Sequence, residues 1–354
     1  IIANNADPLR GDYAGTIEEL DQINRRIKLR KGKSKEENQL PKILSVSEKV
    51  MEHSRYDNLN KNIYRYCQNI LENKNDYKAL TSFLNKDIPS IQGIKPGEKI
   101  IKTENFDKEI PDVISRLNNS FLFIQGPCGT GKTYQAANAI VELIKKKKKI
   151  AITANSHKVI HNLLERIEDI ADKKVEFKGL KMGNPENEDT FYDGKYIKTS
   201  KNEKHYIDGL NDNSVLLFAG TKFHLSSWYY QKKIDYLFID EASQISLSDL
   251  IALGSITKNI ILVGDQQQLG SISQGSHPGE SSKSVLDYLL EGKATIAQDR
   301  GIFLNKTFRL NSKINSFISP CFYDNRLLVH EKNKERKINF SKSSLIKSEG
   351  IHYI

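Results

Sequence analysis

The sequence predicts an α/β fold in which a parallel β-sheet carries helices on both faces. Three observations lead to this prediction. Short, wholly apolar runs recur between residues 121 and 305, and helical segments separate several of them. A glycine-rich loop joins the first run to a helix-forming segment. Strands that are apolar on both sides are typical of parallel sheets buried between two layers of helices.

Six apolar runs are the expected strands of this sheet: residues 121–124, 150–153, 215–220, 236–240, 260–265 and 302–305. Helices are expected between them at 133–145 and 157–170. The polar stretch 173–213 interrupts the alternation and is too long for a simple connection. We expect it to form an insertion or a small subdomain.

The first hundred residues are rich in Lys and Asn and predict a mainly helical N-terminal region. One apolar stripe has the three- and four-residue steps of a helix: Ile17, Leu20, Ile23 and Ile27. A second helix is expected at about 60–84, with a buried stripe of Ile63, Tyr64, Cys67, Ile70 and Leu71. Residues 89–97 carry two Pro and two Gly and predict a linker.

Composition restricts the class of protein. The 354 residues contain 54 Lys and Arg against 44 Asp and Glu, a formal net charge of +10. This excess favours polyanions as partners, although a compositional bias toward Lys explains it equally well. The basic run 25–33 likewise fits a nucleic-acid contact or a basic helix face.

Other features exclude some classes. No apolar run approaches the roughly 20 residues of a membrane span, and no charged-then-apolar leader opens the chain. Three well-separated Cys without a CxxC pair argue against a disulfide framework and a four-Cys metal site, and they predict a cytoplasmic protein. The chain begins at Ile1 and ends at GIHYI, which we interpret as cuts through a longer protein.

The sharpest motif is FLFIQGPCGTGKT at 121–133, which satisfies the pattern G-x4-GK[ST] directly after an expected strand. In such a loop, glycines let backbone N–H groups close around phosphates, and Lys132 reaches the β- and γ-phosphates. The hydroxyl of Thr133 ligates Mg²⁺. The predicted nucleotide-binding residues are Gly126, Gly129, Thr130, Gly131, Lys132, Thr133 and Tyr134.

Two further motifs place polar residues at the ends of expected strands. DYLFIDEASQ at 235–244 offers Asp240 to hold Mg²⁺ through water and Glu241 to polarise an attacking water. Alone, this motif also fits a strand followed by an acidic helix cap. NIILVGDQQQLG at 259–270 delivers Asp265 and Gln268 to the same sheet edge. Gln268 is a candidate sensor of the γ-phosphate, although a solvated turn residue is an equal alternative.

The order GPxGTGKT, DEASQ and GDxxQL resembles superfamily 1 helicases of the Upf-like branch, and the chain is more similar still to bacterial proteins that fuse a RecB-like nuclease to such a helicase. The segments TANSHKVIHNLL and FLNKTFRLNSKINSFISPCFYDNRL extend the resemblance over residues 110–354. It implies two RecA-like domains that hydrolyse ATP between them and move along single-stranded nucleic acid. The expected domains are a helical region with linker at 1–104, a first RecA-like domain at 105–325, and the start of a truncated second one at 326–354.

The resemblance also implies roles for single residues. Arg309 matches an arginine that reaches the γ-phosphate, and Phe308 matches an aromatic residue that stacks on adenine. The residues that match contacts to the strand backbone are Ser156, His157, Lys158 and Thr221. The predicted catalytic residues are thus Lys132, Asp240, Glu241, Gln268 and Arg309, and the metal ligands are Thr133 and Asp240.

The chain departs from the family pattern in three ways. Cys128 replaces the commoner Pro, a change expected to be harmless because this position contributes backbone only. No adenine-reading glutamine precedes the loop, since Gln125 lies too close to it, so base specificity stays open. The later helicase motifs, a second arginine finger and a nuclease carboxylate cluster are absent from the sequence. We therefore expect this chain alone to hydrolyse ATP poorly.

Other clusters have more ordinary explanations. His157, His161 and Glu165 share a helical face, but a solvated or phosphate-contacting face explains them better than a metal site. The five lysines at 145–149 fit the solvated last turn of a helix. The segment SSWYY at 226–230 fits packing better than base stacking.

We expect an ATP-dependent helicase or translocase that uses ATP and Mg²⁺ and acts on single-stranded nucleic acid, DNA before RNA, in DNA repair. A nuclease domain in the same full-length chain is an expected partner. Two alternatives stay open: a nucleotide-gated module that clamps a strand without unwinding it, and a scaffold that binds ATP in support of an attached nuclease.

Overall fold

The computed structural model describes residues 2–4, 12–21, 26–30, 44–46, 53–172, 174–270 and 279–333, with side chains from residue 57 onward. The chain divides into two compact parts, Ile1–Asp57 and Asn58–Ile354, which are described separately. Within the described ranges, no helix is both long and apolar enough to cross a membrane.

The first part holds a four-stranded antiparallel sheet in the order β3-β2-β1-β4. Its strands are β1 (Ile2–Asn4), β2 (Asp12–Asp21), β3 (Arg26–Arg30) and β4 (Leu44–Val46). The helix expected from the stripe at 17–27 is therefore wrong, and Ile23 lies outside the described residues. The basic run 25–33 contributes β3 and not a helix face.

A β-bulge explains why the spacing in β2 resembled a helix. The register pairs Ile17 with Leu29 and Leu20 with Ile27, and one extra residue on β2 shifts the pairing between them. Two apolar positions of one strand thus lie three residues apart, a step that ordinarily indicates a helix. The strict alternation of RIKLR in β3 was the available signal for a strand.

The second part is built on an eight-stranded, all-parallel sheet in the order β12-β5-β11-β10-β6-β9-β7-β8. Six strands confirm the predicted runs: β5 (Phe121–Gln125), β6 (Ile150–Thr153), β9 (Leu217–Ala219), β10 (Ile234–Ile239), β11 (Thr257–Gly264) and β12 (Gly301–Phe303). The remaining two strands come from the polar stretch: β7 (Gly179–Met182) and β8 (Ile197–Ser200), followed by α6 (Glu203–Asn211). This stretch extends one edge of the main sheet and is not a separate subdomain.

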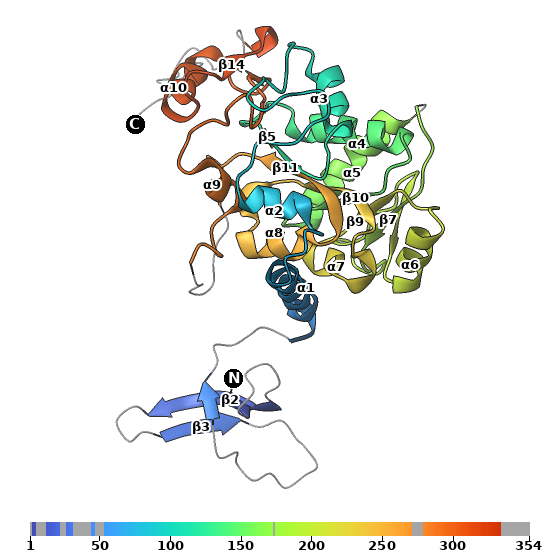
Figure 1. Ribbon diagram of the computed structural model, residues 1–354, viewed down its shortest axis with the longest axis vertical. Helices are drawn as coiled ribbons and strands as arrows, with labels where there is room; N and C mark the ends of the chain where they lie inside the picture. The colour runs from blue at the N-terminus through green and yellow to red at the C-terminus, as the bar shows by residue number, and fades with distance from the viewer. Residues whose placement is uncertain are drawn as a thin grey trace, which may run out of the picture. The chain divides into compact units, whose positions relative to one another are not determined.

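Helices cover both faces of the parallel sheet, as predicted (Figure 1). One layer consists of α3 (Phe106–Ser115), α4 (Lys132–Lys145) and α5 (His157–Ala171). The other consists of α2 (Lys78–Leu84), α7 (Lys222–Leu225), α8 (Leu247–Gly254) and α9 (Val285–Leu290). Strand β5 contributes to both cores, because Leu122 and Ile124 pack with the first layer while Phe121 and Phe123 pack with the second.

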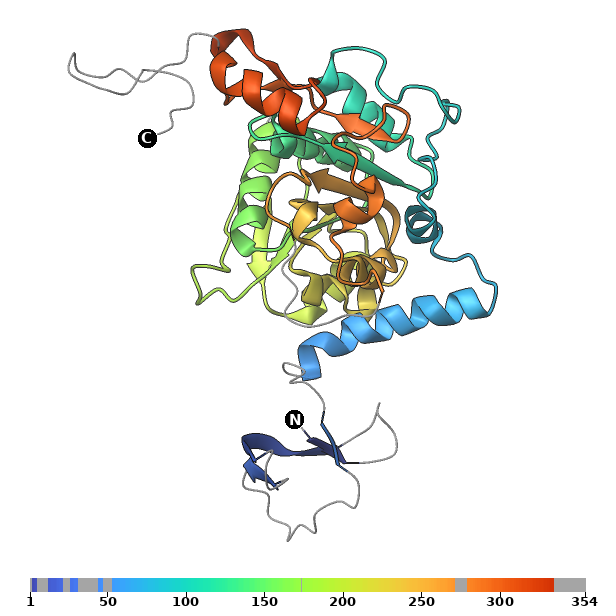
Figure 2. The ribbon, with the colours of Figure 1, turned by 90° about the vertical axis from the view of Figure 1, so that its left-hand side faces the viewer.

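A smaller element follows β12. β13 (Lys306–Thr307) pairs in parallel with β14 (Leu328–Val329), and α10 (Ser312–Phe322) connects them. This element lies at one end of the second part, and the helix α1 (His53–Leu71) lies at the other (Figure 2). The start of a second domain at residue 326 stays a prediction, because residues 334–354 are outside the described ranges.

The buried stripe predicted on α1 is wrong. Tyr64 is 62% exposed and Leu71 is 82% exposed. The residues that are buried instead are Leu59, Asn62, Tyr66 and Asn69. Hydrogen bonds hold this face of α1 against the rest of the second part: Nδ2 of Asn62 donates to the carbonyl oxygens of Ser226 at 3.0 Å and Ala252 at 3.1 Å. A hydrophobic pattern does not reveal a helix that is anchored through an amide side chain.

Replacing Asn62 by alanine should lower the free energy of unfolding by about 1–3 kcal/mol, because two buried carbonyl oxygens lose their donor. Urea denaturation measures this change. Asn162→Ala is the matched control, since Asn162 is an exposed asparagine inside α5. A loss no larger than that of the control would contradict the anchoring role of Asn62.

Candidate active site

The loop after β5 has a conformation that requires glycine. Gly129 and Gly131 have φ angles of 77° and 85°, the left-handed region that side chains rarely adopt. A Cβ on Gly126 would lie 2.3 Å from Cγ of Lys132. Lys132 folds back over the loop, and its Nζ donates to the carbonyl oxygen of Gly126 at 2.7 Å. The loop ends at the first turn of α4, where the helix dipole favours an anion.

The strand order brings the other motifs to this loop. β11 lies between β5 and β10, with Gly264 opposite Gln125 and Leu262 opposite Ile239. Asp265 and Asp240 directly follow these two strands, so both carboxylates leave the sheet at the edge that carries the loop. Burial raises the pKa of each of them, and the charge of Lys132 partly opposes this effect. Residues far apart in the chain are therefore assembled at one edge.

Asp240 is a buried carboxylate at this edge. Asp240 is only 3% exposed. This burial, followed by the charge of Glu241, raises its pKa to about 6. The backbone N–H of Glu241 donates to Oδ1 of Asp240 at 2.9 Å. A buried carboxylate is normally compensated by a cation. Carboxylate and hydroxyl oxygens, which Asp240 and the half-buried Thr133 carry, are the kind of ligand that Mg²⁺ prefers.

Glu241 occupies a strained backbone position. Its φ of 51° and ψ of 47° lie in the left-handed region, where residues other than glycine are uncommon. It follows β10 directly and precedes a short 3-10 helix at Ala242–Gln244. Its side chain is half-buried. Backbone strain of this kind gathers at functional sites, where the surrounding structure maintains it.

Asp265 and Gln268 are joined by hydrogen bonds. Nε2 of Gln268 donates to Oδ2 of Asp265 at 3.3 Å, and the N–H of Gln267 donates to Oδ1 at 3.2 Å. Tyr323, at the end of α10, donates its hydroxyl to Oδ2 at 2.7 Å. Sequence reasoning missed Tyr323, because no local pattern connects residue 323 with residue 265.

The segment 307–309 lies directly against the glycine-rich loop. The hydroxyl of Thr307 donates to the carbonyl oxygen of Cys128 at 3.0 Å, and the N–H of Phe308 donates to that of Gly129 at 2.8 Å. The Nη1 of Arg309 donates to Sγ of Cys128 at 2.8 Å. These contacts bring Arg309 to the loop. They also correct the expectation that Cys128 contributes backbone only, because its thiol accepts a hydrogen bond.

Two aromatic residues are predicted to bind the nucleotide, Phe308 by stacking on the base, and they have different surroundings. Phe308 is 54% exposed, and its ring lies 4.5 Å from that of His330 at an angle of 32°. Tyr134, in the first turn of α4, is 40% exposed. Gln125, the glutamine before the loop, is fully buried. Its Nε2 donates to the carbonyl oxygen of Ala294 at 2.9 Å, and its Oε1 accepts from the N–H of Ile296 at 2.7 Å. Gln125 is thus a structural residue.

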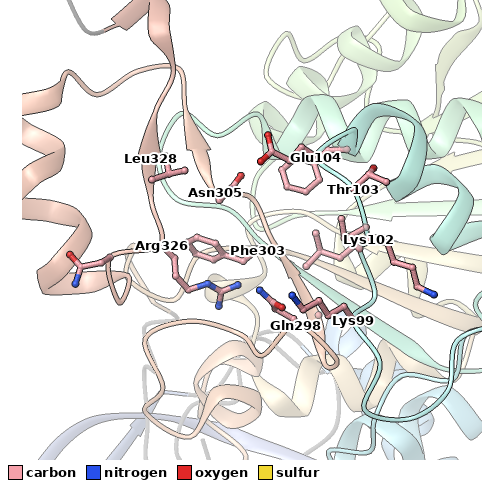
Figure 3. A pocket seen from close by; sticks show the side chains of 14 residues that line it. Lys99, Lys102, Thr103, Glu104, Gln298, Phe303, Asn305, Arg326 and Leu328 are labelled. Carbon is pink, nitrogen blue, oxygen red and sulfur yellow. The ribbon is translucent and has the colours of Figure 1, made fainter.

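A cavity of about 570 Å³ flanks this site. It lies between the segment 99–106 and the chain around β12 and β14, and no residue of 126–133 lines it. Figure 3 shows Arg326 beside the ring of Phe303, with Lys99 opposite. The guanidinium lies 4.5 Å from the centre of that ring. The cavity combines basic, amide and aromatic side chains next to the segment that carries Arg309.

Comparisons with known proteins agree with this geometry. A family model described as an AAA domain matches residues 112–283. The chain is 28% identical over 239 residues to the DNA replication ATP-dependent helicase/nuclease dna2 of Schizosaccharomyces pombe, over 65% of this chain and 16% of that protein. It is 29% identical over 248 residues to the RecBCD enzyme subunit RecD of Buchnera aphidicola, over 62% of this chain and 38% of that protein.

The chain is similar to superfamily 1 helicases.

The chain spans less than half the length of each of these relatives. Among solved structures, an Arterivirus nonstructural protein 10 (helicase) in complex with DNA aligns with a TM-score of 0.37 and 12% identity, over 66% of this chain and 45% of that one. Two of the proteins that this chain is similar to, from Schizosaccharomyces pombe and Saccharomyces cerevisiae, are named DNA replication ATP-dependent helicase/nucleases.

The residues expected to contact single-stranded nucleic acid follow two neighbouring β-strands of the parallel sheet, β6 and β9. Ser156 begins α5 after β6, and its Oγ accepts from the N–H of Val159 at 3.3 Å. Thr221 begins α7 after β9, which pairs with β6. Lys158 is exposed. The parallel pairing places these two helix starts at the same edge of the sheet.

His157 differs from its neighbours. Its Nδ1 is buried without a hydrogen-bond partner, and burial, followed by the charge of Lys181, lowers its pKa. The same causes lower the pKa of His161 to about 4. The lowered pKa of His157 reduces the positive charge that it can offer to a phosphate. Glu165 is exposed, and the described residues contain no group of three metal-binding side chains.

The remaining clusters take the ordinary explanation. Tyr229 and Tyr230 are buried, as packing predicts, while Trp228 is 64% exposed. Lys145 lies in the last turn of α4, paired with Glu142 at 2.6 Å.

Proposed function

We propose that the protein carrying this chain is an ATP-dependent motor that moves along single-stranded DNA and separates duplexes. The observation that carries the proposal is the contact between Arg309 and the glycine-rich loop, 2.8 Å from Nη1 to Sγ of Cys128. An arginine brought to a glycine-rich loop from a distant segment can stabilise the charge that develops during phosphoryl transfer, as an arginine finger does. The relatives named for helicase and nuclease functions in DNA replication support DNA as the strand.

The residues divide the chemistry between them. Lys132 leaves the carbonyl oxygen of Gly126 and contacts the β- and γ-phosphates, and Arg309 neutralises charge that develops on the γ-phosphate. Glu241 orients the attacking water and accepts its proton. Gln268, held by Asp265, reads the presence of the γ-phosphate.

Thr133 and Asp240 would hold Mg²⁺ at this site, because one supplies a hydroxyl and the other a buried carboxylate. The ion supplies positive charge to the phosphates. Asp240 also anchors the backbone of Glu241 through the 2.9 Å hydrogen bond, so the metal ligand positions the base.

The strand lies across the starts of α5 and α7 in this proposal. Ser156, Lys158 and Thr221 offer two hydroxyls and one exposed ammonium to phosphate oxygens. These helices follow β6 and β9, and β6 lies between β9 and β10, the strand that Asp240 follows. A shift at the ATP site therefore reaches both helix starts through the sheet. A nuclease domain elsewhere in the full-length protein would act on the strand that the motor delivers.

Addition of single-stranded DNA should raise ATP turnover by the full-length protein at least about tenfold, because strand binding completes the site. Steady-state turnover with single-stranded DNA, single-stranded RNA and blunt duplex measures this effect, and a strand-displacement assay measures unwinding. Strand binding without any change in turnover would contradict the motor and favour the clamp. Equal stimulation by RNA would contradict the preference for DNA.

Replacing Lys158 by alanine should weaken binding of single-stranded DNA and lower the slope of log affinity against log salt by about 0.7, because one phosphate contact is lost. Fluorescence anisotropy at several salt concentrations measures this slope. Lys174→Ala is the matched control, since Lys174 is exposed just beyond the other end of α5. An unchanged slope for Lys158→Ala would remove this residue from the strand contact.

A further inference from the structure

Tyr323 connects α10 with the candidate γ-phosphate sensor. It follows the last residue of α10, and its hydroxyl donates to Oδ2 of Asp265 at 2.7 Å. Tyr323 is 6% exposed and Asp265 is fully buried. The two residues are 58 positions apart in the chain. This hydrogen bond is thus a buried contact between the ATP site and the element that contains β13, α10 and β14.

Asp265 depends on this contact for its orientation. Oδ1 accepts only from the N–H of Gln267, at 3.2 Å, among the hydrogen bonds described for the chain. Oδ2 accepts from Tyr323 and, more weakly, from Nε2 of Gln268 at 3.3 Å. The short bond from Tyr323 therefore fixes the oxygen on which the amide of Gln268 rests. A change at Tyr323 reaches Gln268 through a single intervening carboxylate.

The position of Tyr323 is itself well determined. Oδ2 of the neighbouring Asp324 accepts from the hydroxyl of Thr295 at 2.7 Å, and Nη1 of Arg326 donates to the carbonyl oxygen of Ile296 at 2.7 Å. The ring of Tyr323 lies 6.2 Å from that of Phe303. The turn after α10 is thus held against the chain around β12, which keeps the hydroxyl in place.

We infer that Tyr323 is a positioning residue that holds Asp265, and through it Gln268, and so couples ATP hydrolysis to the element formed by β13, α10 and β14. The inference rests on the proposed function, since it assigns a partner to the sensor of that site. The element also carries Arg309, so Tyr323 links the two groups proposed to act on the γ-phosphate from different segments.

The expected signature is a loss of turnover without a comparable loss of nucleotide binding. Tyr323 makes no hydrogen bond to residues 126–133, so the glycine-rich loop and Lys132 keep their geometry when the hydroxyl is removed. The group that becomes mobile is Gln268, which acts on the γ-phosphate during hydrolysis. Tyr323→Phe should therefore lower kcat about tenfold and change KM for ATP by less than about twofold.

A double-mutant cycle with Asp265→Asn tests whether the two residues act as one unit. If Tyr323 acts through Asp265, Tyr323→Phe should change kcat no further in the Asp265→Asn background. Multiplicative effects of the two substitutions would overturn the inference. Gln268→Ala provides a second cycle with the same expectation, and it keeps the test valid if Asp265→Asn does not fold.

Tyr206→Phe is the matched control. Tyr206 is fully buried, and its hydroxyl donates to the carbonyl oxygen of Ser200 at 2.7 Å, inside the sheet extension and outside the ATP site. Its loss should change thermal stability but not kcat. A decrease in kcat of similar size for both variants would show a general structural effect and overturn the inference.

The measurement is basal ATP turnover of the full-length protein without nucleic acid, together with calorimetric ATP binding. If single-stranded DNA did not raise ATP turnover, the proposed motor would be contradicted. The double-mutant cycle measured without nucleic acid would then still decide on the role of Tyr323. If single-stranded DNA raised ATP turnover but Tyr323→Phe left kcat unchanged, the role of Tyr323 would be contradicted and the proposed motor would not. Complete absence of ATP turnover in the parent would contradict both.

Discussion

Replacement of Lys132 by alanine should weaken binding of Mg·ATP about 100-fold. Lys132 stands at the first position of α4, and its Nζ already lies within the loop, 2.7 Å from the carbonyl oxygen of Gly126. A hydrogen bond between an ammonium and a phosphate is among the stronger polar interactions, and the neutral methyl group of alanine replaces none of it. Isothermal titration calorimetry with Mg·ATP measures the change.

Lys145→Ala provides the control for Lys132→Ala, because Lys145 ends the same helix in a half-exposed pair with Glu142. Its removal deletes the same charge at the far end of α4 and should leave the affinity for ATP unchanged. Equal affinity of Lys132→Ala and the parent protein would show that the glycine-rich loop does not bind the nucleotide.

The Glu241→Gln variant of the full-length protein should bind ATP normally and hydrolyse it about 10²–10⁴-fold more slowly. Glutamine has the size of glutamate but accepts no proton from water at neutral pH. Its backbone N–H still donates to Asp240, so the metal ligand keeps its hydrogen bond. Single-turnover hydrolysis together with calorimetric ATP binding separates the chemical step from binding.

Glu165→Gln is a suitable control for this substitution, since Glu165 is an exposed glutamate on α5. It should leave turnover at the parent rate. If Glu241→Gln also turned over ATP at that rate, another residue would have to be the base, and the role of the strained position after β10 would need a different explanation.

The parts predicted well from the sequence are those that depend on neighbouring residues. Wholly apolar runs predicted six of the eight parallel strands, because a strand covered on both faces needs apolar residues at every position. The glycine-rich loop was also recognisable from neighbouring residues. Gly129 and Gly131 adopt positive φ angles, a conformation that glycine takes up more readily than other residues. β7 and β8, the last two strands at one side of the sheet, were missed because polar residues such as Lys181 and Lys198 interrupt their apolar residues.

Predictions failed where contacts between distant segments decide the structure. The bulge in β2 produced a helical spacing in a strand, and the pairing with β3 is what resolves it. On α1, the hydrogen bonds of Asn62 to carbonyl oxygens of other segments determine which face of the helix is buried. The apolar residues predicted to form the buried face point elsewhere. The contact of His157 with a nucleic-acid strand stays a prediction, but only the tertiary structure shows that its Nδ1 is buried without a hydrogen-bond partner and that burial, followed by the charge of Lys181, lowers its pKa.

The sequence by itself determined the α/β class and the order of the strands along the chain, and it predicts Lys132, Asp240 and Glu241 as the chemical groups of the site. These follow from local periodicity and from motifs whose residues are adjacent. Only the tertiary structure decided that β11 lies between β5 and β10, that Arg309 reaches the thiol of Cys128, and that Tyr323 donates to Asp265. The physical reason is that these contacts join residues tens to hundreds of positions apart. Their geometry is set by the packing of whole elements on the sheet, which no short stretch of sequence encodes.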